Sequence, residues 1–98
     1  MKIPKGFKKL DIAEYLKTED EIQGFLESCF EEAGDDPKFI THALGIAARA
    51  RSMTSVSKKS GLTRTSLYKA LSGNTNPSLD TFLKVVKALG FKLQMAPA

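Results

Sequence analysis

Residues 54–73 read TSVSKKSGLTRTSLYKALSG, and the interpretation of the whole chain begins with them. Leu67 and Leu71, with an alanine between them, recur at the spacing of one side of a helix. Gly61 can adopt the left-handed conformation that ends a helix, and Thr63 can cap the next helix by accepting a hydrogen bond from a backbone amide. The pattern predicts two short helices that cross steeply on a tight turn.

The outward side of the second helix is rich in hydrogen-bond donors and carries no carboxylate. With the leucines turned inward, the residues that remain outside are Arg64, Thr65, Ser66, Tyr68 and Lys69. In a helix-turn-helix this helix enters the major groove, where Arg or Lys can pair with guanine and Thr can contact a base edge or a thymine methyl group. A solvated helix face is the alternative for either cation alone, but the whole pattern favours DNA.

Charge is distributed unevenly along the 98 residues, which are enough for one domain with a modest core. Residues 1–35 carry five Lys and nine Asp or Glu, which gives −4. Residues 36–98 carry ten Lys or Arg and two Asp, which gives +8. This asymmetry indicates a basic part that binds phosphate and an acidic part with another task.

Several classes of protein are not indicated by the sequence. No apolar run is long enough to span a membrane, and the lysine-rich residues 1–10 lack the apolar core of a signal peptide. One cysteine, Cys29, precludes an internal disulfide, so we expect a cytoplasmic protein. Cys29 and the single histidine, His42, form an imaginable catalytic dyad, but a buried thiol is the simpler interpretation. We expect no enzyme, no cofactor and no metal site, because no metal-ligand cluster or phosphate loop is evident.

The N-terminal third predicts a basic arm and two helices. After residues 1–10, the segment Ile12 to Leu16 can form a short helix. Thr18 and Glu21 then stand at the spacing of a capping box, before an acidic amphipathic helix that ends at Gly34. This helix can simply pack on the core, or its charge can also dock it on a basic protein partner.

Two longer helices and a tail are predicted on either side of the central pair. Asp36 and Pro37 begin a helix that runs to about Arg51, whose final cations suit the helix dipole and can reach phosphate. Ser78 caps a last helix that ends at Gly90. Apolar and polar residues alternate over residues 91–95, so the tail can form one short strand. A lone strand needs a partner, which favours a dimer.

Several segments resemble known families. From about Leu44 to Leu89 the order of elements, and especially the run GLTRTSLYKALSGNTNPSLDTFLKVVKALG, resembles the lambda-repressor or Cro-like helix-turn-helix group. The segments LYKALS, NPS and DIAEYL, the last followed by an acidic helix, resemble the antidote proteins of chromosomal addiction modules. The resemblance covers nearly the whole chain.

The resemblance implies an all-α, lambda-repressor-like domain of five to six helices. Residues 1–35 would be an arm and helical extension packed on the same core, and residues 36–98 the helix-turn-helix domain. The protein would be an antitoxin that neutralises a toxin, often small, basic and RelE-like or ParE-like, and represses their operon as a homodimer on double-stranded DNA. The alternative is a helix-turn-helix repressor without a toxin.

The resemblance also implies which residues meet DNA. The base-contacting positions of the family fall on Thr63, Arg64 and Thr65, with Lys69 one turn later. Thr54 and Ser55 would open the preceding helix and contact phosphate. The expected DNA-binding set is Thr54, Ser55, Thr63, Arg64, Thr65, Ser66, Tyr68, Lys69 and Asn74, the last in the loop that follows.

Overall fold

A computed structural model describes residues 12–72 and 74–97 of the chain. These residues form a short 3-10 helix and five α-helices, and they contain no strand. The elements are η2 (Ile12–Tyr15), α1 (Glu19–Ala33), α2 (Pro37–Arg51), α3 (Met53–Ser60), α4 (Arg64–Ala70) and α5 (Leu79–Ala88). The prediction of an all-α fold is confirmed for this part of the chain.

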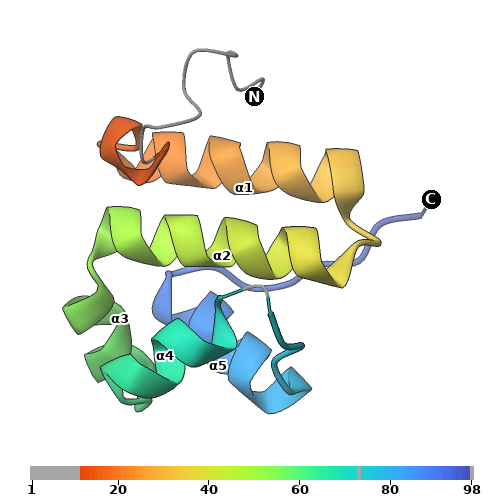
Figure 1. Ribbon diagram of the computed structural model, residues 1–98. Helices are drawn as coiled ribbons and strands as arrows, with labels where there is room; N and C mark the ends of the chain where they lie inside the picture. The colour runs from red at the N-terminus through yellow and green to blue at the C-terminus, as the bar shows by residue number, and fades with distance from the viewer. Residues whose placement is uncertain (1–11, 73, 98) are drawn as a thin grey trace.

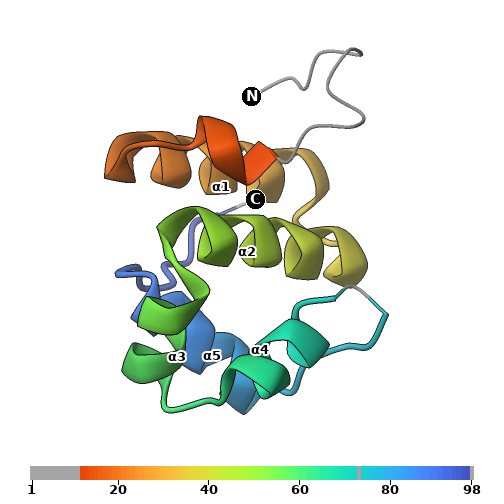
Figure 2. The ribbon, with the colours of Figure 1, turned by 60° about the vertical axis from the view of Figure 1, so that its left-hand side comes forward.

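The helix α2 lies at the centre of the molecule. α1 runs along one side of it, and α3, α4 and α5 lie on the other side, as both ribbon views show (Figure 1, Figure 2). α2 can fill this position because its buried residues extend around much of its surface: Ile40, Thr41, Ala43, Leu44, Gly45, Ile46, Ala47 and Ala48. Small residues in this set let the neighbouring helices approach closely.

The acidic helix α1 forms as its local sequence predicts. The Thr18 side chain accepts a hydrogen bond from the Glu21 backbone N–H at 3.1 Å, and the Glu21 carboxylate accepts one from the Thr18 backbone N–H at 3.0 Å. This capping box satisfies two backbone donors at the start of the helix. The buried stripe that follows consists of Ile22, Phe25, Leu26 and Cys29 and packs α1 on α2.

One arginine joins three helices at the far end of α2. The Arg51 guanidinium forms an ion pair with Glu19 at the start of α1, and its Nη2 also donates to the Leu89 carbonyl oxygen at 2.9 Å. These contacts hold the side chain within the protein. The sequence did not predict these two partners, and a contact of Arg51 with phosphate stays a prediction.

The tail after α5 does not form the short strand expected at residues 91–95. Gly90, with φ of 88°, turns the chain, and the Phe91 backbone N–H donates to the Val86 carbonyl oxygen at 3.2 Å. Residues 91–97 then continue without regular structure. Alternating side chains are not sufficient for a strand, because a strand also needs the edge of another strand, and the described residues offer none.

Candidate nucleic-acid interface

The turn between α3 and α4 is fixed by hydrogen bonds on both sides of its glycine. Gly61 has a φ of 77° and ends α3, with its N–H donating to the Ser57 carbonyl oxygen at 3.0 Å. The Ser57 hydroxyl donates to the Leu62 carbonyl oxygen beyond the turn. The Thr63 hydroxyl oxygen then accepts from the Ser66 backbone N–H at 3.0 Å and caps α4. The two helices predicted around Gly61 are present, while their role in DNA binding stays a prediction.

The core fixes which side of α4 faces outward. Leu67 is fully buried and Leu71 is nearly so, and both belong to the common core with Val56 of α3. The side chains on the opposite side are exposed: Arg64, Thr65, Ser66, Tyr68 and Lys69. The structure therefore places together, on one surface, the five α4 residues that the sequence predicted to face outward.

These polar residues differ in whether their side chains already form hydrogen bonds within the protein. The Thr63 hydroxyl donates to the Ser66 hydroxyl at 2.9 Å in addition to capping the helix, so both groups take part in holding the turn. In the described part of the chain, Arg64, Thr65 and Lys69 make no side-chain hydrogen bond or ion pair. Their donors can therefore bind a ligand without first breaking an internal contact.

The start of α3 differs from the prediction by one residue. The helix begins at Met53, and Ser52 is its cap, with the Ser52 hydroxyl oxygen accepting from the Ser55 backbone N–H at 3.2 Å. The Ser55 amide is thus unavailable to a phosphate, whereas the Thr54 side chain is exposed. Ser52 has a φ of 144°, the one positive φ at a non-glycine residue among those described. Nothing in the local sequence indicates such a conformation at a serine.

Two further residues lie near the end of α4. Asn74 is exposed in the following loop, where its backbone N–H donates to the Ser72 hydroxyl oxygen at 3.2 Å. Arg49, near the end of α2, lines a depression of about 190 Å³ together with Tyr68 and Ser72. Arg49 of α2 and Tyr68 of α4, both exposed, therefore border the same part of the surface.

The segment that builds this surface is strongly basic. Residues 37–79 contain seven Lys or Arg and no Asp or Glu. Of these cations, Lys58 and Lys59 lie exposed in the last turn of α3, and Arg64 and Lys69 lie exposed on α4. A surface on which exposed cations gather attracts polyanions through its summed field.

The residues of the imagined catalytic dyad have other environments. Cys29 is buried in the core, and burial, with a smaller contribution from the nearby Glu32 carboxylate, raises the pKa of its thiol. A raised pKa keeps the thiol protonated, which is the reverse of what an activated nucleophile needs. His42 lies exposed on α2. Among the described residues, no group of three or more His, Cys, Asp or Glu is arranged to hold a metal ion, and no helix is long and apolar enough to cross a membrane.

Comparison with known proteins covers almost the whole chain. A family model described as "Probable addiction module antidote protein" matches residues 6–97. A protein of Haemophilus influenzae is 44% identical over 88 residues, which span 90% of this chain and 89% of the relative, and it carries the name "Uncharacterized protein". No solved structure matches the chain.

Proposed function

Because this chain belongs to the family of probable addiction module antidote proteins, we propose that it is an antitoxin that neutralises a toxin and represses their shared operon. The single observation that carries the DNA-binding part is the surface of α4. Arg64, Thr65 and Lys69 are exposed and make no internal side-chain bonds in the described part of the chain. They also lie within a segment that contains no carboxylate.

In this proposal α4 enters the major groove as the second helix of a helix-turn-helix. Arg64, at the start of α4, pairs with a base edge, and a bidentate contact with guanine is its preferred form. Thr65 contacts a base edge or a thymine methyl group, and Lys69 contacts a base or the backbone one turn later. Lys58 and Lys59 of α3 bind phosphate, which supplies affinity without sequence preference.

The repressor acts as a homodimer in this proposal. α4 has seven residues and offers few base contacts, each of which discriminates by about 1–3 kcal/mol, so useful specificity needs two half-sites. On α5, Leu79 and Leu83 are 70% and 44% exposed and lie one helical turn apart. A two-fold contact can bury this apolar patch on both copies at once, in place of the tail strand that does not form.

The DNA-binding role is tested by binding of the purified protein to the DNA upstream of its own gene. Arg64→Ala should weaken binding to the operator by about tenfold or more and relax the preference at one position of each half-site, because a base contact of about 1–3 kcal/mol is lost. Lys58→Ala should weaken binding to operator and unrelated DNA alike. It should reduce the number of counterions released when the dimer binds by about two, one for each copy. An unchanged operator affinity for Arg64→Ala would contradict the placement of α4 in the groove.

The antitoxin role is tested with the protein encoded by the neighbouring small gene. We propose a small, basic toxin of the RelE-like or ParE-like kind. Expression of the neighbouring gene alone should arrest growth, and co-expression with this chain should restore growth and yield a complex of the two proteins. If the neighbouring protein is harmless when expressed alone, a repressor without a toxin partner is the better interpretation.

A further inference from the structure

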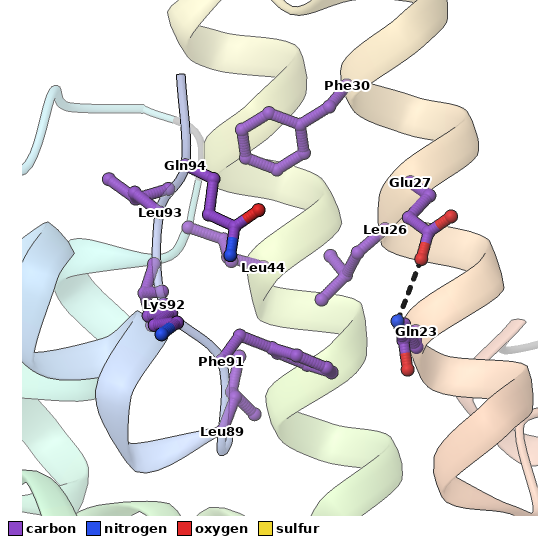
Figure 3. Close-up of a pocket in the computed structure, with 11 residues that line it drawn as sticks. Gln23, Leu26, Glu27, Phe30, Leu44, Leu89, Phe91, Lys92, Leu93 and Gln94 are labelled. Atoms are coloured by element: carbon purple, nitrogen blue, oxygen red, sulfur yellow. Dashed lines mark hydrogen bonds between the residues drawn. The ribbon is translucent and has the colours of Figure 1, made fainter. Parts of the chain in front are cut away.

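An apolar groove runs between α1 and the C-terminal tail, across the middle of α2 (Figure 3). Its volume is about 440 Å³, within the range of protein sites that hold a ligand or an inserted side chain. Leu26 and Phe30 project from α1 toward the tail, and Phe91 lies across from Leu26. Gln94 points from the tail into the groove, whereas the Leu93 side chain extends from the tail on the side away from α1. Leu44 of α2 lies between the two walls.

Several apolar side chains that line the groove remain exposed to solvent. Phe30 and Phe91 are only half-buried, and the Leu93 side chain is 51% exposed. Met95, two residues further along the tail, is fully exposed. Exposed apolar side chains beside a groove are a common mark of a protein-binding site.

The α1 side of the groove is strongly acidic. α1 contains six Asp or Glu and no Lys or Arg. Glu27 lines the groove, and its carboxylate accepts a hydrogen bond from the Gln23 side chain at 2.9 Å. Glu31 follows Glu27 by four residues, so the two like charges lie on one side of the helix. The tail supplies the one cation among the residues that line the groove, Lys92.

Three of the six carboxylates of α1 lie in its first turn, where the helix dipole favours them, but those nearer its end oppose the stability of the helix. Glu31 and Glu32 lie in the last turn, at the negative end of the helix dipole, where carboxylates are unfavourable. Glu27 and Glu31 repel each other at i, i+4 spacing. Glu19 is different, because Arg51 neutralises it at the start of the helix. A cationic partner placed along Glu27 and Glu31 would relieve both unfavourable interactions.

We propose that this groove binds a segment of the toxin that presents an apolar side chain flanked by Lys or Arg. The apolar side chain enters between Phe30 and Phe91, and the flanking cations meet Glu27 and Glu31. The inference rests on the proposed antitoxin function and adds to it the surface that the toxin occupies. Charge complementarity favours this occupant over DNA and over a second copy of the chain. DNA phosphates would be repelled by the carboxylates of Glu27 and Glu31. In a two-fold contact, the same two carboxylates of a second copy would repel them as well.

The location of the groove separates it from the proposed DNA surface. α1 lies on one side of α2, and α4 lies on the other side, in both ribbon views (Figure 1, Figure 2). The groove therefore leaves Arg64, Thr65 and Lys69 uncovered. One copy of the chain can hold the toxin and operator DNA at the same time.

The test measures binding of the purified product of the neighbouring gene to three variants of the full chain. The double variant Glu27→Lys/Glu31→Lys reverses the charge of the two α1 side chains. Leu93→Asp places a carboxylate on the tail at an exposed residue that lines the groove. Glu14→Lys is the matched control, because Glu14 is exposed on η2 and does not line the groove. Calorimetric titration should show at least about a tenfold loss of toxin affinity for the first two and less than about a twofold change for the control.

The operator shift assay on the same samples reports whether the variants fold. All three should bind operator DNA within about twofold of the unmodified protein, and a mixture with toxin should form a ternary complex. If the groove variants bind the toxin normally, the groove assignment is wrong and the antitoxin role survives. If the unmodified protein does not bind the product of the neighbouring gene, the antitoxin role is wrong, and this inference is then wrong as well. If Leu93→Asp converts a dimer into a monomer by light scattering, a second copy occupies the groove and the proposal is overturned.

Discussion

A glycine-to-alanine substitution is expected to have opposite effects on stability in α1 and α2. Gly24 and Gly45 both lie inside long helices, where alanine is favoured over glycine by about 0.5–1 kcal/mol because glycine loses more backbone entropy on folding. A Cβ atom at Gly24 would meet no atom within 4 Å. Gly24→Ala should therefore stabilise the protein by nearly this full amount.

At Gly45 the same methyl group has no room. A Cβ atom there would lie 2.9 Å from the Leu71 carbonyl oxygen and 3.4 Å from the Leu71 Cβ atom. The oxygen belongs to the backbone at the end of α4, so relief requires a movement of α4 relative to α2. Overpacking of this kind costs about 1–3 kcal/mol, which exceeds the gain in helix propensity. Gly45→Ala should be destabilising by up to about 2 kcal/mol once that gain is subtracted.

Thermal unfolding followed by circular dichroism measures both effects in one experiment. For a domain of this size about 1 kcal/mol corresponds to about 4–8 °C, so the two variants should differ in Tm by at least about 5 °C, with Gly24→Ala the higher. Because Gly45→Ala displaces the end of α4, it should also weaken operator binding, whereas Gly24→Ala should not. Equal melting temperatures for the two variants would refute the close packing of α2 on α4.

Two smaller predictions concern Ser52 and Cys29. Ser52→Ala should destabilise the protein by about 1 kcal/mol because α3 loses its cap. Ser52→Gly removes the same hydroxyl, but glycine adopts the φ of 144° without strain. The glycine variant should therefore unfold at a higher denaturant concentration than the alanine variant. The reverse order would contradict the strained backbone at this position. Iodoacetamide at pH 8 should alkylate Cys29 slowly in the folded protein and rapidly in urea, because burial both shields the thiol and raises its pKa. Equal rates of alkylation would show that α1 does not cover it.

Four of the five α-helix starts were predictable from the sequence because the interactions that fix them are local, and α3 is the exception. Thr18, Asp36, Thr63 and Ser78 each accept a hydrogen bond from a backbone amide two or three residues later, so the residues that decide each start lie within one turn. The outward side of α4 was predictable for a similar reason, since the inward positions follow from the spacing of the leucines. The contacts that these residues make with DNA stay predictions.

Long-range contacts decide the features that the sequence did not predict. The internal partners of Arg51 were not predicted, because Glu19 and Leu89 are 32 and 38 residues away from it in the sequence. The tail was expected to form a strand, but a strand forms only where another strand can pair with it, and the described residues contain none. The groove combines α1 with residues that follow α5, and no local pattern indicates that these segments meet.

The opposite charges of the two sides of the molecule coexist because salt screens them from each other. The acidic helix α1 and the basic pair α3 and α4 are separated by α2, and a helix with its side chains is about 10–12 Å across. The Debye length at physiological ionic strength is about 8 Å, so the field of α1 is largely screened before it reaches the outer side of α4. The acidic helix therefore leaves the positive potential outside α4 largely uncancelled. The net charge of +4 is therefore a poor guide to the local potential, which is negative around α1 and positive around α3 and α4. Each of these two surfaces can attract a partner of the opposite charge.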